Sequence, residues 1–269
     1  MQTVGLIGAG RMGLPIVGHL VRAGLRVLVS ERNPNLRGDI ESRGASLVDL
    51  KTLAAESEVI LICVGYDNEV RELLQASGGL LETVRPDTII AVLSTIHPKT
   101  MQELAKLADL RGVHVVDSTV CRGGEAADKG TLLSFVGGSK DVVERLKPVL
   151  SAYSSDVVHS GDVGTAQVSK AANNLMLWAC LVASHEGLAL AQRYKVDVEA
   201  LRAALMTSSA TNGALGNWGN QSMAWAQDDM AIITEMADDC GISLPQSGVV
   251  REICRTLKPR RYQLEKYGA

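Results

Sequence analysis

One stretch decides the fold of this chain, Thr3-Val4-Gly5-Leu6-Ile7-Gly8-Ala9-Gly10-Arg11-Met12-Gly13. Its first five residues predict a short buried strand, because they are largely apolar and a glycine follows. A helical pattern comes next, and Gly24 stands where a glycine ends a helix. A second apolar strand covers residues 27–30 and ends at Glu31. Strand, glycine turn, helix, strand and acid therefore follow one another in the order of a dinucleotide site.

Three glycines give this stretch the spacing of a dinucleotide-binding loop. We expect Gly8 to allow a tight turn, Gly10 to let the backbone approach a pyrophosphate, and Gly13 to let the helix pack closely. The phosphates would lie at the positive amino end of that helix. We therefore predict that this region binds the cofactor, through Gly8, Ala9, Gly10, Arg11, Met12, Gly13, Glu31 and Arg32.

Composition excludes several other classes of function. The chain has 269 residues, 46% of them hydrophobic, and a net charge of −3, so no basic field favours nucleic acid. The apolar run from Leu175 to Ala183 is too short to cross a bilayer, and a strand this close to Met1 leaves no room for a signal peptide. Five cysteines without a CxxC pair, and no metal-ligand spacing, indicate reduced thiols and no metal site. We expect a cytoplasmic protein with no membrane or nucleic-acid partner.

The first 160 residues alternate between strand and helix patterns. Strands are predicted at residues 59–64, 88–93, 113–116 and 132–136, and helices at 67–75, 98–110 and 139–152, the last interrupted near Pro148. We expect a short helical connection up to Ala55 and a polar loop from Asp117 to Gly130. This alternation predicts an α/β fold with a doubly wound, mostly parallel sheet.

The pattern changes at Gly161, beyond which only helices are predicted. They cover residues 164–193, 196–206, 223–239 and 247–257, with a Ser-, Thr-, Asn- and Gly-rich loop at 208–220. We therefore predict two domains. A dinucleotide-binding domain covers residues 1–162, and an all-α domain covers residues 163–269.

Lys170 and Asn174 are candidates for chemistry, because residues four apart share a helix face. A lysine in an alanine-rich helix at a domain junction can donate a proton when it is partly buried near a cofactor. The alternative from spacing alone is a lysine in solvent.

Four motifs in sequence resemble those of the β-hydroxyacid dehydrogenases, which include 3-hydroxyisobutyrate dehydrogenase and tartronate semialdehyde reductase. They are Gly8-Ala9-Gly10-Arg11-Met12-Gly13, Ser94-Thr95-Ile96-His97-Pro98, the Asp117–Gly130 segment, and Gly161-Asp162-Val163-Gly164 leading to Lys170 and Asn174. The resemblance covers nearly the whole chain. It implies a Rossmann domain over residues 1–162, followed over residues 163–269 by a long interdomain helix and an all-α substrate and dimerisation domain.

The resemblance also implies roles for individual residues. Lys170 would be the catalytic lysine that protonates the carbonyl oxygen during reduction, and Asn174 would hold substrate beside it. Ser94 and Thr95 would contact the nicotinamide ribose and the substrate. Val64 and Gly65 would line the cofactor.

The substrate loop departs from the family pattern. The family usually has Ala-Pro-Val-Ser-Gly-Gly, whose backbone amides and serine hold the substrate carboxylate, and this chain has Ser118-Thr119-Val120-Cys121-Arg122-Gly123. We predict that Cys121, Arg122 and Gly123 contact substrate, and that the Arg122 guanidinium grips an anionic group. The alternative for Arg122 is a surface arginine. In the helical part, Asp228 also stands where the family usually has a lysine.

Cofactor choice depends on Glu31 and Arg32. A carboxylate at the end of the second strand accepts hydrogen bonds from the adenosine ribose and repels a 2′-phosphate, whereas an adjacent arginine can bind that phosphate. We expect NAD, with NADP as the alternative.

The sequence thus predicts an NAD(P)-dependent oxidoreductase that moves a hydride between nicotinamide and a small β-hydroxy acid or the corresponding semialdehyde. We expect a small anionic substrate and a homo-oligomer, a dimer or tetramer. Two alternatives stay open at this point, an imine reductase-like enzyme and a module that binds NAD(H) without turnover.

Overall fold

The structure is a computed structural model that describes residues 2–268. The chain divides into two compact units, Met1–Lys170 and Ala171–Ala269, and each is described here by itself. The predicted boundary between residues 162 and 163 falls between the last strand and the long helix that begins at Thr165. Its placement as a domain boundary stays a prediction.

The first unit contains one eight-stranded sheet with the strand order β3-β2-β1-β4-β5-β6-β7-β8. All neighbouring strands are parallel except β6 and β7, which pair antiparallel, so the predicted doubly wound, mostly parallel sheet is confirmed. The strands are β1 (Thr3–Ile7), β2 (Arg26–Ser30), β3 (Ser46–Leu47), β4 (Val59–Ile62), β5 (Ile89–Val92), β6 (His114–Cys121), β7 (Leu132–Gly137) and β8 (Ser154–Gly161).

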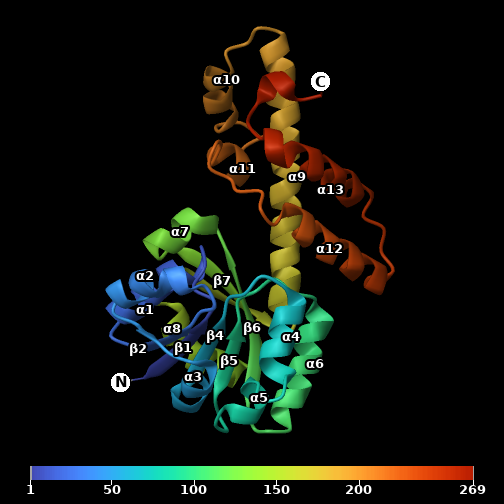
Figure 1. The fold of residues 1–269 in the computed structure, drawn as a ribbon. Helices are drawn as coiled ribbons and strands as arrows, with labels where there is room; N and C mark the ends of the chain where they lie inside the picture. Colours follow the sequence, from blue (N-terminus) through green and yellow to red (C-terminus); the bar gives the residue numbers. More distant parts are fainter. Residues whose placement is uncertain (1, 269) are drawn as a thin grey trace. The chain divides into compact units, whose positions relative to one another are not determined.

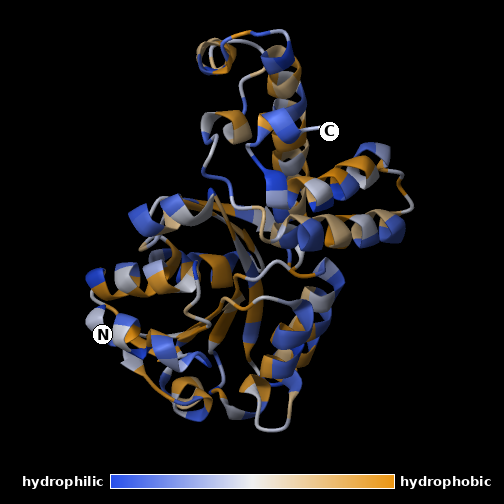
Figure 2. Cartoon of the chain, turned by 45° about the horizontal axis from the view of Figure 1, so that its top comes forward, coloured by the Kyte–Doolittle hydropathy of each residue, from blue (hydrophilic) through white to orange (hydrophobic). Residues whose placement is uncertain are grey.

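Helices connect the strands and cover both faces of the sheet (Figure 1). They are α1 (Gly13–Arg22), α2 (Arg37–Ser42), α3 (Leu50–Glu56), α4 (Asp67–Gln75), α5 (Leu80–Thr83), α6 (Pro98–Asp109), α7 (Gly123–Lys129) and α8 (Lys140–Leu150). One hydrophobic core joins the sheet to α1, α7 and α8, and a second joins it to α3, α4 and α6. The central strands β1, β4 and β5 are hydrophobic, whereas the outer faces of the helices are hydrophilic (Figure 2). This double covering explains why β4 is an uninterrupted apolar run.

Four details of the prediction for the first unit were wrong. The polar segment from Asp117 to Gly130 is not a loop, because β6 continues to Cys121 and α7 follows it. The antiparallel partner β7 supplies backbone hydrogen bonds to this part of β6, and the buried side chains of Asp117 and Thr119 bond to backbone groups of residues 164–167. Neither β3 nor β8 was predicted, since the first has two residues and the second is polar and half exposed. Pro148 lies inside the last turn of α8, two residues before the helix ends.

The second unit is helical, as predicted. The long helix α9 (Thr165–Arg193) starts within the first unit and continues into the second, followed by α10 (Val198–Leu205), α11 (Gly213–Gly216), α12 (Ala226–Cys240) and α13 (Pro245–Leu257). The short α11 lies within the segment that was expected to be a loop. By length and composition α9 could also span a membrane, a test that core helices of other proteins pass as well. Its residues Trp178, Leu181 and Val182 are buried in the core with α12 and α13.

Candidate active site

The glycine loop between β1 and α1 has the geometry of a phosphate-binding turn. Gly8 has a φ of +91°, a backbone conformation that is strained for any residue with a side chain. Its N–H donates to the Ser30 carbonyl at 3.1 Å. A Cβ atom on Gly13 would overlap the Gly8 carbonyl oxygen, so Gly13 allows close packing of the helix. A Cβ on Gly10 would meet no protein atom within 4 Å. Protein packing therefore does not require Gly10, and the open space beside it fits a dinucleotide pyrophosphate.

The helix after this loop suits an anion. No acidic residue lies in the first turn of α1, and the first N–H groups of a helix lack acceptors within the helix. At the other end, the Gly24 N–H donates to Val21 and the Leu25 N–H to Leu20, which caps the helix with a left-handed glycine as predicted.

Glu31 lies at the carboxyl end of β2 and is bound to the glycine loop. Its Oε2 accepts the Ala9 N–H at 2.6 Å, and its Oε1 accepts the Asn33 N–H at 2.8 Å. Arg32 is exposed beside it. The carboxylate is thus held at the predicted ribose position before any ligand binds.

Arg11 of the glycine loop forms a bidentate ion pair with Asp128 of α7, with N–O distances of 2.9 and 2.7 Å. Their hydrogen bonds raise the pKa of Arg11 and lower the pKa of Asp128. A Cβ on Gly124 would crowd the guanidinium, so this glycine makes room for the pair. The loop predicted to bind phosphate is therefore joined to the helix that follows the predicted substrate loop.

Ser94, Val64 and Gly65 come together at the carboxyl ends of β4 and β5. The Ser94 hydroxyl accepts the Val64 N–H at 3.0 Å and donates to the Val64 carbonyl at 2.9 Å. Glu69, which the sequence analysis did not single out, accepts the N–H groups of Gly65 and Tyr66 at 2.9 and 3.0 Å. Thr95 follows Ser94 and is half-buried. The structure thus joins three residues predicted from separate motifs.

A buried network fixes the first turn of α9, the helix that carries Lys170. Asp117 accepts the N–H groups of Gly164 and Gln167 at 2.8 and 2.9 Å. Burial raises the pKa of Asp117, and the N–H donors oppose that rise. The Gln167 side chain accepts the Ile96 N–H at 3.0 Å and donates to the Ser94 carbonyl at 2.9 Å.

Sequence reasoning missed these roles of Asp117 and Gln167. Asp117 bonds to the first turn of α9 as a helix-capping acid does, but it lies far from that helix along the chain, so no local pattern pointed to it. Their hydrogen bonds join the start of α9 to the Ser94 segment and to β6.

Lys170 faces the end of β6. Its Nζ donates to the Val120 carbonyl at 2.7 Å and lies 3.9 Å from the Cys121 Sγ. Lys170 is half-buried, and Cys121 is buried. Asn174, one helical turn further in the second unit, accepts a hydrogen bond from Asn173. The predicted catalytic lysine and the predicted substrate loop are therefore in contact within one unit.

Arg122 does not stand free in solvent. Its Nη1 donates to the Thr131 carbonyl, the Ser155 hydroxyl and the Asp156 carboxylate, at 3.0, 2.8 and 2.7 Å. These contacts engage the guanidinium with β8 and the start of β7. Binding of an anionic substrate group by Arg122 stays a prediction. Asp228 lies in the first turn of α12.

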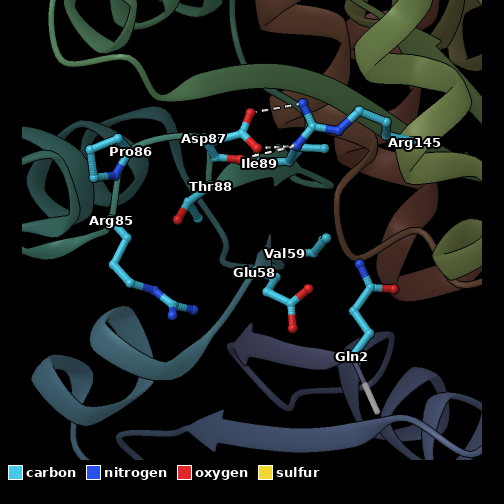
Figure 3. Close-up of a pocket in the computed structure, with 9 residues that line it drawn as sticks. All are labelled: Gln2, Glu58, Val59, Arg85, Pro86, Asp87, Thr88, Ile89 and Arg145. Atoms are coloured by element: carbon cyan, nitrogen blue, oxygen red, sulfur yellow. Dashed lines mark hydrogen bonds and ion pairs between the residues drawn. The ribbon is translucent and has the colours of Figure 1, made fainter.

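A cavity of about 420 Å³ lies at the opposite, amino ends of β1, β4 and β5. Figure 3 shows that Asp87 and Arg145, two of its charged residues, pair with each other. Open α/β sheets bind their ligands at the carboxyl ends of the strands, so this cavity is not the candidate site. Among residues 2–268, no group of three or more His, Cys, Asp and Glu side chains is placed to hold a metal ion.

Comparisons with known proteins agree with this geometry. Residues 3–161 match the NAD binding domain of 6-phosphogluconate dehydrogenase, and residues 164–265 match the family described as NAD-binding of NADP-dependent 3-hydroxyisobutyrate dehydrogenase. The 3-hydroxyisobutyrate dehydrogenase of Pseudomonas aeruginosa is 32% identical over 80% of this chain and 72% of its own length. The 2-(hydroxymethyl)glutarate dehydrogenase of Eubacterium barkeri is 26% identical over 93% of this chain and 87% of its own length.

Solved structures share the fold. A 3-hydroxyisobutyrate dehydrogenase from Mycobacterium tuberculosis superposes over the full length of both chains with a TM-score of 0.89 at 22% identity. An imine reductase from Myxococcus stipitatus superposes over 97% of this chain and 95% of its own, with a TM-score of 0.70 at 19% identity.

Proposed function

We propose, from the premise that this chain belongs to the β-hydroxyacid dehydrogenase family, that it interconverts a small anionic β-hydroxy acid and the matching semialdehyde. The protein is an NAD(P)-dependent oxidoreductase. The observation that carries the substrate proposal is the Lys170 ammonium at the end of β6, beside the segment predicted to bind substrate.

The cofactor fits the residues at the carboxyl edge of the sheet. The Gly8–Gly13 loop would hold the pyrophosphate, and Glu31 would accept the ribose hydroxyls. The Ser94 and Val64 segment would line the nicotinamide side. When bound, the nicotinamide supplies or accepts the hydride. NAD is the proposed cofactor, since Glu31 is fixed where a 2′-phosphate would have to lie.

Lys170 is proposed to move the proton. During reduction, negative charge develops on the substrate carbonyl oxygen, and an ammonium within hydrogen-bond distance stabilises that charge and donates a proton. In the oxidation direction, the neutral amine takes the hydroxyl proton back. The carbonyl of Val120 holds the ammonium in place, and the Asp117 and Gln167 network holds the helix that carries it.

Lys170→Ala is expected to reduce turnover by roughly a hundredfold or more, because general acid catalysis contributes about 10²–10⁴. The dissociation constant for NADH, measured by fluorescence, should change little. Lys106→Ala is the matched control, since Lys106 is an exposed lysine in the last turn of α6. Full turnover in Lys170→Ala would refute the proposed role.

The substrate class is tested by measuring NAD⁺ and NADP⁺ reduction with 3-hydroxyisobutyrate, and NADH and NADPH oxidation with tartronate semialdehyde, succinic semialdehyde, sulfolactaldehyde and several cyclic imines. Turnover of an acid or aldehyde supports the proposal. Turnover of imines alone would assign imine reduction instead. Nucleotide binding without any turnover would point to a binding module. A cytoplasmic location and a homo-oligomeric state stay predictions.

A further inference from the structure

The turn after β6 has an unusual backbone. Arg122 has φ +83° and ψ 0°, and Gly123 has φ +73°, so two left-handed residues follow one another. Glycine adopts this region at little cost, whereas the Cβ of any other L-residue is crowded there. Arg122 is therefore strained directly after Cys121 and two residues after Val120, the acceptor of the Lys170 ammonium. Strain of this kind persists only where surrounding contacts hold it.

The contacts that hold Arg122 come from its own side chain. The Nη1 atom bonds to the Thr131 carbonyl, the Ser155 hydroxyl and the Asp156 Oδ2, all within 3.0 Å. The Ser155 hydroxyl also donates to the Asp156 Oδ2 at 2.8 Å. One nitrogen thus binds the start of β7 and the edge strand β8 together.

The register of the sheet places these groups in one row. Cys121 of β6 pairs with Leu133 of β7, and Leu133 pairs with Asp156 of β8. The Arg122 side chain therefore crosses β7 to reach the carboxylate two strands away. Hydrogen bonds from Ser155 and Arg122 lower the pKa of Asp156, so its carboxylate is ionised at neutral pH and pairs with the Arg122 charge.

Solvent exposure limits what the ion pair alone could do. The Arg122 and Asp156 side chains are 44% and 52% exposed, and exposed ion pairs of that kind stabilise proteins little. The geometry is more specific than the charge, since the same guanidinium nitrogen also binds a backbone carbonyl. The cluster Arg122, Thr131, Ser155 and Asp156 is thus suited to fix a conformation rather than to stabilise the fold.

We propose that Asp156 is a positioning residue for the substrate, acting through Arg122 to hold the Cys121-Arg122-Gly123 turn in its left-handed form. The inference rests on the proposed function, which assigns this turn to substrate binding. The direction of the backbone amides in this turn depends on the φ angles of Arg122 and Gly123, so a contact with a substrate carboxylate depends on the same angles. Arg122 then acts as a prop for the backbone, and its guanidinium is not the ligand of the substrate anion.

The test is a double-mutant cycle with Asp156→Ala, Arg122→Gly and the combined variant. Asp156→Ala should raise KM for the preferred acid about fivefold, with kcat within about twofold and the NADH dissociation constant unchanged. On the Arg122→Gly background, whatever its own KM, Asp156→Ala should have no further effect, because glycine needs no prop. Glu56→Gln, which removes the similarly exposed Arg26–Glu56 pair at 2.6 Å, is the control and should leave KM unchanged.

Two results would overturn the proposal. An equal rise in KM on both backgrounds would show that Asp156 acts without Arg122. A fall in KM in Asp156→Ala would show that Arg122, once released, binds the substrate anion itself.

A readout that does not need turnover separates this proposal from the function it rests on. The backbone NMR chemical shifts of residues 122–124 should move in Asp156→Ala relative to the parent chain, and the same mutation should not move them on the Arg122→Gly background. If the parent chain turns over no acid, the proposed function fails while these shifts still decide whether Asp156 holds the turn. Unchanged shifts in Asp156→Ala would overturn the proposal.

Discussion

The Glu31 carboxylate is hydrogen-bonded to the glycine loop. Its two oxygens accept separate N–H groups, one from Ala9 in the loop and one from Asn33 after β2. These bonds hold a negative charge at the position where the adenosine ribose of a dinucleotide is expected. The neighbouring Arg32 is exposed. A 2′-phosphate bound to Arg32 would lie close to the negative charge of Glu31.

Glu31→Asn should shift cofactor preference toward NADP. Removing the charge removes its repulsion of the 2′-phosphate, so the ratio of kcat/KM for NADPH to that for NADH should rise by at least about tenfold. Steady-state kinetics with both cofactors measure this ratio. Glu41→Gln on α2, which loses an exposed pair with Arg37, should leave the ratio unchanged. If the ratio for Glu31→Asn also stays the same, Glu31 does not set the preference.

At the scale of elements, the start of α9 is held by side chains of β6 and by its own Gln167. Asp117 of β6 accepts the Gln167 N–H, and Thr119 of β6 donates to the Ala166 carbonyl. The Gln167 side chain accepts the Ile96 N–H in the segment after β5. All three side chains are buried. A helix fixed in this way carries Lys170 to a defined place, which a helix joined only by a flexible loop would not do.

Gln167→Leu should destabilise the first unit. The leucine leaves the Ile96 N–H and the Ser94 carbonyl without these partners, and each unsatisfied buried group costs about 1–3 kcal/mol. Urea unfolding measures the loss, and turnover should fall as well. Gln102→Leu is the matched control, because its exposed bond to the Val163 carbonyl is 3.4 Å long and its loss should cost less than about 0.5 kcal/mol. Equal losses in both variants would contradict the assigned role of Gln167.

At the scale of the molecule, each unit has its own hydrophobic core, so the two can unfold in separate steps. His185 belongs to the helical unit and is buried against the rings of Trp218 and Tyr262, whose centroids lie 4.5 and 5.3 Å away. Its Nε2 accepts the Tyr262 N–H at 3.0 Å, so its Nδ1 carries the proton and donates to the Leu181 carbonyl. The folded state therefore requires a neutral ring.

The helical unit should lose stability in mild acid. Burial lowers the pKa of His185 below its ordinary value of 6.5, so the unfolded chain binds a proton that the folded unit excludes. The stability is complete above pH 6.5 and falls as the pH drops from there toward the folded pKa. Urea unfolding at a series of pH values should show this for the helical unit. His185→Gln should weaken the dependence, whereas His159→Gln on β8 should not, and an unchanged slope in His185→Gln would refute the explanation.

Local signals were sufficient for much of this protein. The glycine loop, the apolar run of β4 and the helical periodicity of α9 depend on neighbours a few residues apart, so the Rossmann sheet and the helical second half were predicted correctly. The same reasoning assigned Lys170 to an exposed or a partly buried place without deciding between them. The two-residue strand β3 and the polar strand β8 lack a pattern of their own and form only beside their partners.

By itself, the sequence determined the fold class, the order of the motifs and the chemistry that each motif offers, because these follow from backbone preferences and the burial of apolar faces. Only the tertiary structure decided which distant groups meet. It extended β6 through a polar segment, placed Val120 against Lys170 and directed Arg122 to Asp156. Such contacts join residues 34–50 positions apart, and their geometry is set by the register of strands packed around a common core.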